Sequence, residues 1–202
     1  FKIKDLNYIY YKTRSKVIAI LTNPNKSNVR INSKLLNYLE NLRYVVTAST
    51  GTNHIDKIFL KKKKINLISL TKEFSTIKKI SSTSELAFAL TIAAVRNIQN
   101  ANTSVKRGKW DYLPFVGRQM NELTVGIIGF GRLGKIYYKY IKTFKSKILV
   151  CDPYVKKTKF KKINFVSLKD IASKCDIISL HVHHTKETEK MISNFFLGTC
   201  KR

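Results

Sequence analysis

The sequence predicts an α/β protein built on parallel β-sheets. Short apolar runs rich in β-branched residues alternate with segments whose apolar residues recur at helical spacing. One of these runs ends directly in the glycine-rich turn 129–134, and a helical pattern follows that turn. Strands that alternate with helices in this way form parallel sheets, because each parallel connection needs a crossover segment.

The N-terminal third of the chain predicts a first sheet. Residues 17–21 form the first expected strand, which the turn residues 23–25 close. Asn32 or Ser33 can cap a helix whose leucines recur over residues 35–42. A strand, a helix and a strand are expected next, at residues 44–48, 55–63 and 65–70.

The turn Gly129-Phe-Gly-Arg-Leu-Gly134 is a G-x-G-x-x-G motif at the end of an apolar strand over residues 125–128. Gly129 allows the tight turn from strand to helix, and Gly131 lets a pyrophosphate approach the backbone. Gly134 lets the helix pack close to the sheet. The helix then carries one apolar stripe, with lysines on its opposite face.

The pattern continues into an acidic residue. A second apolar run, residues 148–151, ends in Asp152, about 20 residues beyond the glycines, as a dinucleotide-binding unit requires. Asp152 is expected to accept hydrogen bonds from the adenosine ribose. The N–H groups of Arg132 and Leu133 open the helix and are expected to hold phosphate oxygens. A structural glycine turn is the alternative, but it does not explain the second strand and its terminal acid.

The segments on either side of this motif are predicted as follows. Ser82 and Glu85 form a capping-box pattern ahead of a helix over residues 84–97. That helix is apolar nearly all round, so burial between domains or subunits is expected. Residues 100–122 look irregular. Beyond Asp152, a strand, a helix and a strand are expected at residues 164–166, 168–174 and 176–182.

The composition excludes several classes of protein. Of the 202 residues 44% are hydrophobic, enough for a globular core, and no apolar run is long enough to span a membrane. The cysteines Cys151, Cys175 and Cys200 are far apart in the sequence, which favours a reducing, cytoplasmic setting over a disulfide framework or a zinc site.

The net charge of +27 raises the possibility of a polyanion partner. The lysines are spread over the polar faces of the predicted helices, and only Lys61–Lys64 form a dense run. We interpret that run as the solvated end of a helix and the charge as a uniform compositional bias. No nucleic-acid partner is expected; salt-dependent retention on DNA would test this.

Three histidines near the end of the last strand, His181, His183 and His184, suggest a metal site at first sight. On a strand His181 and His183 share a face while His184 points away, and no carboxylate or cysteine stands at ligand spacing. No metal is therefore expected. Trp110 is interpreted as a packing anchor, and His54 as a loop residue without a catalytic role.

Several ordered motifs resemble the D-isomer-specific 2-hydroxyacid dehydrogenase family, which includes D-3-phosphoglycerate dehydrogenase. Residues 48–56, Ala-Ser-Thr-Gly-Thr-Asn-His-Ile-Asp, are similar to the family's substrate loop. Residues 125–134 are close to its nucleotide signature, and residues 151–154, Cys-Asp-Pro-Tyr, to its ribose-binding turn. Residues 176–187 resemble the strand and loop that follow.

The resemblance implies a partial flavodoxin-like substrate domain over residues 1–72. A Rossmann-type NAD-binding domain, present as its first half, is implied over residues 73–202. NAD is the implied cofactor, a small 2-hydroxy or 2-oxo acid the implied substrate, and a homodimer joined through the long helix the implied assembly. Thr50 is implied to lie near the nicotinamide, with the N–H groups of Thr50 and Gly51 receiving the substrate carboxylate. Val182 is implied to border the cofactor through its backbone.

The sequence departs from the family pattern in ways that affect function. The family's catalytic arginine, acid and histidine lie beyond the segment that matches residues 191–196, so no catalytic residue is assigned. An opening strand of the substrate domain is expected before Phe1. His183 replaces the usual proline, and Glu122-Leu123 the usual Gly-Lys. We therefore expect an inactive fragment of a dehydrogenase; the alternative is a non-catalytic NAD-sensing or interaction module.

Overall fold

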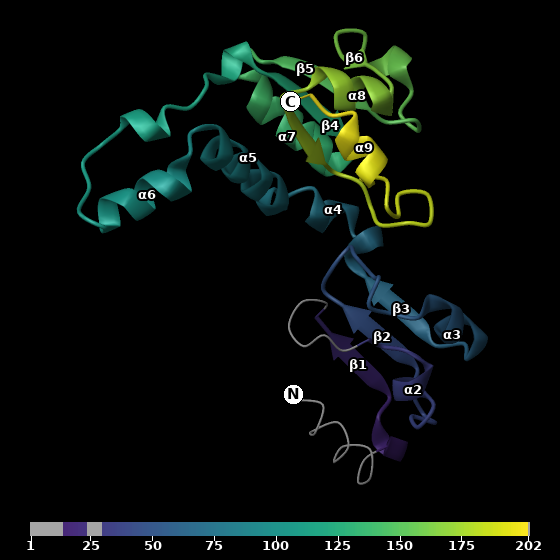
Figure 1. The fold of residues 1–202 in the computed structure, drawn as a ribbon. Coiled ribbons are helices and arrows are strands. Elements are labelled where there is room, and N and C mark those ends of the chain that lie inside the picture. The colour runs from purple at the N-terminus through teal and green to yellow at the C-terminus, as the bar shows by residue number, and fades with distance from the viewer. Residues whose placement is uncertain (1–13, 24–29, 202) are drawn as a thin grey trace. The chain divides into compact units, whose positions relative to one another are not determined.

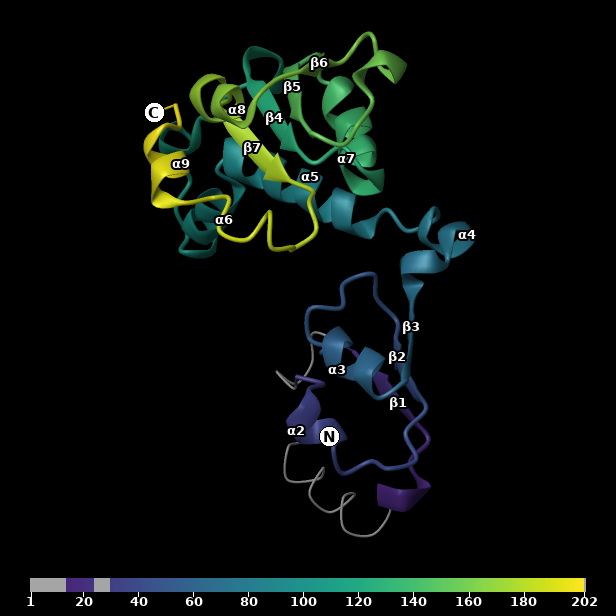
Figure 2. The ribbon, with the colours of Figure 1, turned by 90° about the vertical axis from the view of Figure 1, so that its right-hand side faces the viewer.

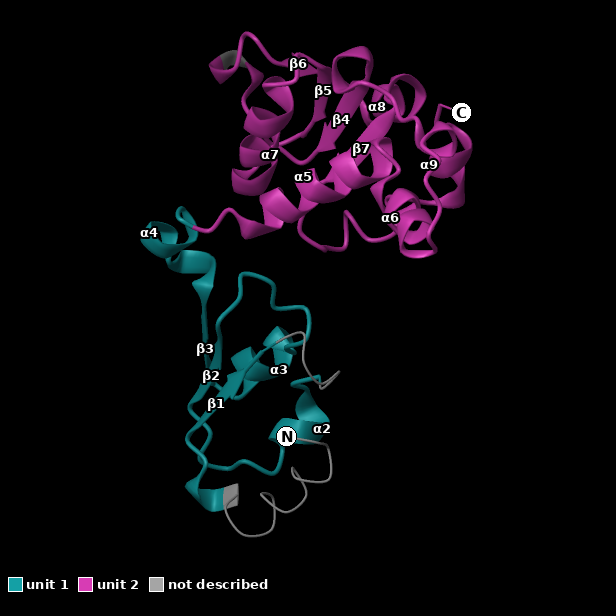
Figure 3. Ribbon diagram, turned by 90° about the vertical axis from the view of Figure 1, so that its left-hand side faces the viewer, with its two compact units in different colours: residues 1–79 teal, residues 80–202 magenta. Residues whose placement is uncertain are grey.

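The computed structural model describes residues 14–23 and 30–201. The chain divides into two units, Phe1–Lys79 and Ile80–Arg202 (Figure 3). Each unit carries its own parallel sheet and its own hydrophobic core. The predicted parallel α/β class is therefore confirmed.

Within the described part of the first unit, three parallel strands lie in the order β1-β2-β3 (Figure 1). Helices α2 and α3 connect them, and a 3-10 turn and the short helix α4 follow. The elements are η1 (Arg14–Lys16), β1 (Ala19–Thr22), α2 (Ser33–Leu36), β2 (Tyr44–Thr47), α3 (Lys57–Lys62), β3 (Asn66–Ser69), η2 (Leu70–Lys72) and α4 (Phe74–Ile77).

One face of this sheet carries the core of the first unit. Val45 is fully buried at its centre, and Ile20 and Leu67 pack beside it against residues of α2 and α3. On the opposite face Leu21 and Ile68 are 78% and 50% exposed. Only one layer of helices therefore covers this sheet in the described residues.

The local predictions for the first unit hold with two changes. Asn32, not Ser33, is the N-cap of α2: its side chain accepts a hydrogen bond from the N–H of Leu35. The predicted helix over residues 35–42 is shorter than expected, because α2 ends at Leu36 and the buried Leu39 and Leu42 follow in turns. Lys61–Lys64 are exposed at the end of α3, as predicted. The predicted turn at Pro24-Asn25 lies outside the described residues.

In the second unit, the described strands lie in the order β6-β5-β4-β7, all parallel. The elements are α5 (Ser82–Val95), α6 (Ile98–Lys106), η3 (Leu113–Phe115), η4 (Met120–Glu122), β4 (Thr124–Ile128), α7 (Arg132–Lys142), β5 (Lys147–Cys151), η5 (Lys157–Lys159), β6 (Asn164–Phe165), α8 (Leu168–Lys174), β7 (Ile177–Leu180) and α9 (Asn194–Gly198).

Helices cover both faces of this second sheet (Figure 2). Val125 and Ile127 of β4 point into a core shared with α5 and α7. Ile128 and Leu149 face the other way, into a core shared with α8 and α9. Because every second residue of β4 faces the opposite core, a continuous apolar run is required there. From β4 the chain passes through α7 to β5 and β6, which lie on one side of β4. It then passes through α8 to β7, which lies on the other side. This is the doubly wound arrangement of nucleotide-binding sheets.

Two predictions in this unit are corrected, and a third is not tested by a single chain. The capping box of Ser82 and Glu85 is absent from the described structure, because α5 begins earlier: Ser81 is its N-cap, and the Ser81 hydroxyl donates to the Glu85 carboxylate. Residues 100–106, part of the stretch expected to be irregular, belong to α6. Within one chain α7 covers only one face of α5, and Leu86 and Leu90 are each 61% exposed; burial of their face between subunits stays a prediction.

The start of β7 is fastened by Asp176. Its carboxylate accepts hydrogen bonds from Lys201 Nζ (2.7 Å), the Thr124 N–H (2.8 Å) and Arg118 (3.1 Å), and its side chain is only 9% exposed. The Lys201 bond, followed by the Thr124 N–H, lowers the pKa of Asp176 to about 2. This carboxylate therefore joins the amino ends of β4 and β7 to the C-terminal segment.

Asp176→Asn is expected to destabilise the second unit at neutral pH. The folded-state pKa lies below the usual 3.8, so the stabilisation is complete above about pH 5 and is lost as the pH falls toward 2. In urea unfolding at pH 7, the free energies of unfolding of variant and parent should differ by about 1–3 kcal/mol. This difference should become smaller as the pH falls. Glu189→Gln, in an exposed loop, is the control; a pH-independent gap would contradict the assignment.

Candidate nucleotide site

The site begins where β4 turns into α7. Ile128, the last residue of β4, pairs with Cys151 of β5, so the carboxyl ends of these strands lie side by side. The turn opens at Gly129, whose φ of +91° is a conformation that side chains rarely adopt. A Cβ there would lie 2.7 Å from the carbonyl oxygen of His181. Glycine at this position is therefore a requirement of the fold.

The other two glycines differ in what surrounds them. A Cβ on Gly134 would lie 2.1 Å from the carbonyl oxygen of Gly129, so the helix packs directly on the turn. A Cβ on Gly131 would meet no protein atom within 4 Å. Gly131 is the N-cap of α7, and the open space beside it lies at a helix terminus whose first N–H groups have no intrahelical partner. This open cradle fits the pyrophosphate of a dinucleotide.

Asp152 is held in place by the backbone around it. Its Oδ2 accepts from the Phe130 N–H at 2.7 Å and its Oδ1 from the Tyr154 N–H at 2.9 Å. The Gly129 N–H also donates to the Cys151 carbonyl at 2.8 Å. The carboxylate therefore stands beside the glycine turn in a fixed orientation, with lone pairs left for the hydroxyls of a ribose.

A cavity of about 800 Å³ opens beside these groups at the carboxyl edge of the sheet. It is large enough for the adenosine half of a dinucleotide. It brings Gly129, Asp152 and Val182 together, and thus unites three of the residues that the sequence singled out. Its lining also includes Tyr154, Lys157, Phe165, Leu168, Glu187 and Met191.

Tyr154 and Glu187 are site residues for which no role was predicted from the sequence. The Tyr154 hydroxyl donates to the Glu187 carboxylate, which raises the pKa of Tyr154. This bond joins the turn after β5 to the loop after β7 at the rim of the cavity. Both residues stand inside the motifs that pointed to the site, but only the fold shows that the two motifs meet.

The remaining predicted residues are placed as follows. Leu133 lies in the first turn of α7, and the Arg132 guanidinium donates to the carbonyl of Ile80, so the side chain of Arg132 turns toward the segment that enters α5. Thr50 and Gly51 belong to the first unit, in the loop after β2. There the Thr50 carbonyl accepts from Thr71 Oγ1 (3.3 Å) and the Gly51 carbonyl from Ser49 Oγ (2.6 Å).

The histidines have different environments. His183 and His184 are exposed, whereas His181 is partly buried, which lowers its pKa. Burial also lowers the pKa of His54, whose Nε2 is buried without a hydrogen-bond partner. Within residues 14–23 and 30–201, no group of three or more histidine, cysteine or carboxylate side chains is arranged to hold a metal.

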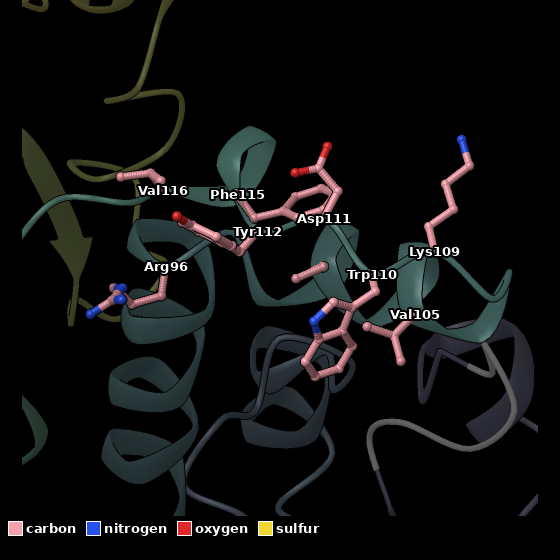
Figure 4. A pocket seen from close by; sticks show the side chains of 9 residues that line it. Arg96, Val105, Lys109, Trp110, Asp111, Tyr112, Phe115 and Val116 are labelled. Atoms are coloured by element: carbon pink, nitrogen blue, oxygen red, sulfur yellow. The ribbon is translucent and has the colours of Figure 1, made fainter.

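Trp110 does not pack inside the chain as the sequence suggested. It is 94% exposed and lines a groove of about 360 Å³ beside α6. Figure 4 shows Tyr112 and Phe115 lining the same groove, with Arg96 and Lys109 near its ends. The segment after α6 therefore presents aromatic side chains to its surroundings.

Two family models match the chain and overlap to cover nearly all of it. Residues 88–202 match the NAD-binding domain of the D-isomer specific 2-hydroxyacid dehydrogenases, and residues 9–107 match the catalytic domain of the same family. The second sheet, with its glycine turn and Asp152, lies within the matched NAD-binding domain.

Curated relatives and solved structures agree with these matches. D-3-phosphoglycerate dehydrogenase of Archaeoglobus fulgidus is 32% identical over 169 residues, which are 83% of this chain and 31% of that protein. Hydroxypyruvate reductase of Thermotoga maritima is 30% identical over 87% of this chain and 56% of its own length. This chain thus spans between about a third and just over half of these relatives.

Among solved structures, D-lactate dehydrogenase of Aquifex aeolicus, complexed with NAD and lactic acid, superposes with a TM-score of 0.80 and 28% identity. The superposition covers 97% of this chain and 56% of the Aquifex chain. NAD-dependent formate dehydrogenase of Staphylococcus aureus, at 22% identity, shares the fold with a TM-score of 0.85 over 98% and 57% of the two chains. Together, the matched models and relatives show that this chain belongs to the D-isomer specific 2-hydroxyacid dehydrogenase family, with its NAD-binding domain in the second unit.

Proposed function

We propose that this chain carries the NAD site and part of the substrate domain of an NAD-dependent oxidoreductase that acts on small D-2-hydroxy or 2-oxo acids. The observation that carries the proposal is the pairing of an open cradle at Gly131 with a pre-oriented carboxylate at Asp152. When bound, NAD supplies a site that accepts or donates a hydride. The protein's own part is to bind, orient and shield that group.

The proposed binding roles follow the geometry of the site. Gly129 and Gly134 shape the turn, and Gly131 leaves it open. The N–H groups of Arg132 and Leu133 hold the pyrophosphate, and Asp152 holds the ribose. The backbone of Val182, which lines the cavity, borders the cofactor. The support for these roles is the convergence of three strand ends at one edge of the sheet.

The first unit is proposed to receive the substrate. We assign residues 1–72 to a substrate domain and residues 73–202 to the NAD-binding domain. Hydroxyl groups hold the carbonyls of Thr50 and Gly51 and so help to fix the loop; the N–H groups of these two residues are the proposed donors for the substrate carboxylate. The names of the relatives support 3-phosphoglycerate and hydroxypyruvate as candidate substrates.

The 202-residue chain alone is proposed to bind NAD without turning over substrate. The proposal is supported by the resemblance, which implies that the family's catalytic arginine, acid and histidine lie beyond the segment that matches residues 191–196. We expect the purified chain to oxidise NADH with hydroxypyruvate, glyoxylate or phosphohydroxypyruvate at least ~10²–10⁴-fold more slowly than a protein extended to the length of its relatives, because general acid–base catalysis contributes a factor of that size.

Steady-state assays of both proteins, side by side, test this. Comparable rates would contradict the proposal and direct attention to His54 and His181. An extended protein that binds NAD but has no activity toward any 2-oxo acid would instead support a nucleotide-sensing module.

A homodimer is proposed for the extended protein, with the outer face of α5 in the interface. Leu86 and Leu90 stand exposed on that face, and apolar patches of this kind mark association sites. Trp110, in the groove beside α6, adds further exposed apolar surface.

We expect light scattering to show a dimer that Leu86→Lys combined with Leu90→Lys converts to monomer. Each leucine contributes about 1.5–3 kcal/mol when buried, so the dissociation constant should rise by at least ~10². Ile58→Lys, a similarly exposed apolar residue of α3 in the first unit, is the matched control. A parent protein that is already monomeric would refute the dimer.

The proposed location is the cytoplasm. Cys151, Cys175 and Cys200 are all free thiols, and burial raises the pKa of Cys175 to about 11, which keeps that thiol protonated. Unpaired cysteines are typical of reducing compartments. In the described residues, no helix has the length and apolar character needed to cross a bilayer.

A further inference from the structure

Helix α5 buries two polar residues, Ser84 and Thr91, and exposes its leucines. Ser84 is fully buried and Thr91 is 7% exposed, whereas Leu86 and Leu90 are each 61% exposed. The hydrophobic effect alone would produce the opposite distribution. The buried hydroxyls must therefore be satisfied by specific partners, and those partners lie on α7.

Three side-chain hydrogen bonds join α5 and the segment before it to the start of α7. The Ser84 hydroxyl donates to the carbonyl of Leu133 at 3.0 Å, in the first turn of α7. The Arg132 guanidinium, one residue earlier, donates to the carbonyl of Ile80. One turn further along α7, Thr91 Oγ1 lies 2.7 Å from the hydroxyl oxygen of Tyr137.

The direction of the bond between Thr91 and Tyr137 follows from the proton count. Thr91 Oγ1 also donates to the Ala87 carbonyl at 2.9 Å, and a hydroxyl carries a single proton. Tyr137 must therefore donate to Thr91. Burial raises the pKa of Tyr137, which keeps this donor protonated.

Tyr137 also contacts the strand end behind the glycine turn. Its ring centroid lies 4.8 Å from that of His181, whose Nε2 is 3.0 Å from Ser179 Oγ. The His181 carbonyl oxygen packs against Gly129, where a Cβ would lie only 2.7 Å away. Tyr137 thus stands between α5 and the backbone that supports the turn.

We propose that Ser84, Thr91 and Tyr137 are positioning residues for the pyrophosphate of the cofactor. They fix the first turn of α7 against α5 and so aim the N–H groups of Arg132 and Leu133. This inference rests on the proposed NAD site and adds to it: α5, which contributes no residue to the cavity lining, sets the strength of phosphate binding.

Ser84→Ala and Tyr137→Phe each remove one hydroxyl and test the proposal in the intact 202-residue chain. In Ser84→Ala the Leu133 carbonyl keeps its helical bond. In Tyr137→Phe Thr91 keeps its bond to Ala87, and Ser179, the other hydroxyl partner of Tyr137, keeps its contact with His181, so neither variant orphans these partners. Each is expected to raise the calorimetric Kd for NAD about three- to tenfold, the effect of one net hydrogen bond. Tyr137→Phe keeps the ring in the core, so it carries the test should Ser84→Ala fail to fold.

Ser146→Ala is the matched control. Ser146 Oγ donates to the Met120 carbonyl at 2.6 Å, the same kind of bond, at the amino edge of the sheet and away from the cavity. Its loss should lower stability comparably and leave the Kd for NAD unchanged. A merely structural role for Ser84 would make Ser84→Ala behave like this control.

Binding of ligands with and without a pyrophosphate separates a loss of phosphate positioning from a general loosening of the second unit. Affinity for ADP-ribose, which contains the pyrophosphate, should fall with that for NAD, whereas affinity for adenosine, followed by NMR titration, should stay constant. Equal losses for adenosine and ADP-ribose, or no loss for either, would overturn the proposal. An unmodified chain that binds none of these ligands would instead contradict the NAD site itself.

Discussion

Gly131→Ala is expected to remove measurable NAD binding while it leaves the chain folded. A Cβ at this position meets no protein atom within 4 Å, and φ is −73°, which alanine adopts without strain. The added methyl group would stand where the pyrophosphate must approach the backbone. The expected loss of stability is about 0.5–1 kcal/mol, since alanine is a poorer N-cap than glycine.

Gly134→Ala, in contrast, should lower the stability of the fold. Its Cβ would lie 2.1 Å from the Gly129 carbonyl oxygen, and that atom belongs to the backbone, which has no flexible end to move aside. Overpacking of this kind costs typically ~1–3 kcal/mol or more. We expect both stability and NAD binding to fall, because helix and turn must separate.

Denaturant unfolding and calorimetry on the two variants test this contrast. Gly131→Ala should lose NAD binding with little change in its free energy of unfolding. Gly134→Ala should show a clear loss of free energy of unfolding together with its loss of binding. Gly131→Ala with parental affinity for NAD would show that the cofactor does not approach the backbone at this turn.

Asp152→Ala is expected to weaken NAD binding about 10- to 100-fold and to narrow the preference for NAD over NADP. Hydrogen bonds to a charged group contribute about 1.5–3 kcal/mol, and the carboxylate that would repel a 2′-phosphate is removed. The variant also leaves the Phe130 N–H without its 2.7 Å acceptor, so a loss of stability should accompany the loss of affinity.

The control must change the same charge in the same cavity. Asp170→Asn meets this need, because Asp170 lines the cavity but pairs with Lys174 at 2.6 Å on α8. Parent, Asp152→Ala and Asp170→Asn are each titrated with NAD and NADP. The difference in affinity between the two cofactors should become smaller only in Asp152→Ala. Tighter binding of NADP than of NAD by the parent chain would defeat the claim.

The nucleotide unit could be predicted from the sequence because its signals are local. The strand, the glycine turn, the helix and Asp152 follow one another within a single stretch, and each glycine has a stereochemical reason. Residues 98–106 also carried a local signal that the polar composition obscured: Ile98, Ala101 and Val105 recur at the spacing of one helix face.

Other features could not be predicted because they depend on distant partners. The hydrogen bonds of Ser84 and Thr91 reach 49 and 46 residues along the chain. A helix that is apolar nearly all round gives no indication of which face meets its neighbour, so the sequence could not show that Leu86 would be exposed. The contact of Tyr154 with Glu187 likewise appears only when two strand ends meet.

The central claim is that NAD binds at the carboxyl edge of the second sheet. Titration of the ¹⁵N-labelled chain with NAD, followed by amide chemical shifts, tests it most directly. The account predicts saturable shifts at residues 129–134, at Asp152, Tyr154 and Val182, with Met120 and Ser146 at the opposite edge unaffected. Shifts confined to exposed lysines and abolished by moderate salt would contradict it, since they would show only nonspecific attraction of an anion to a protein of charge +27.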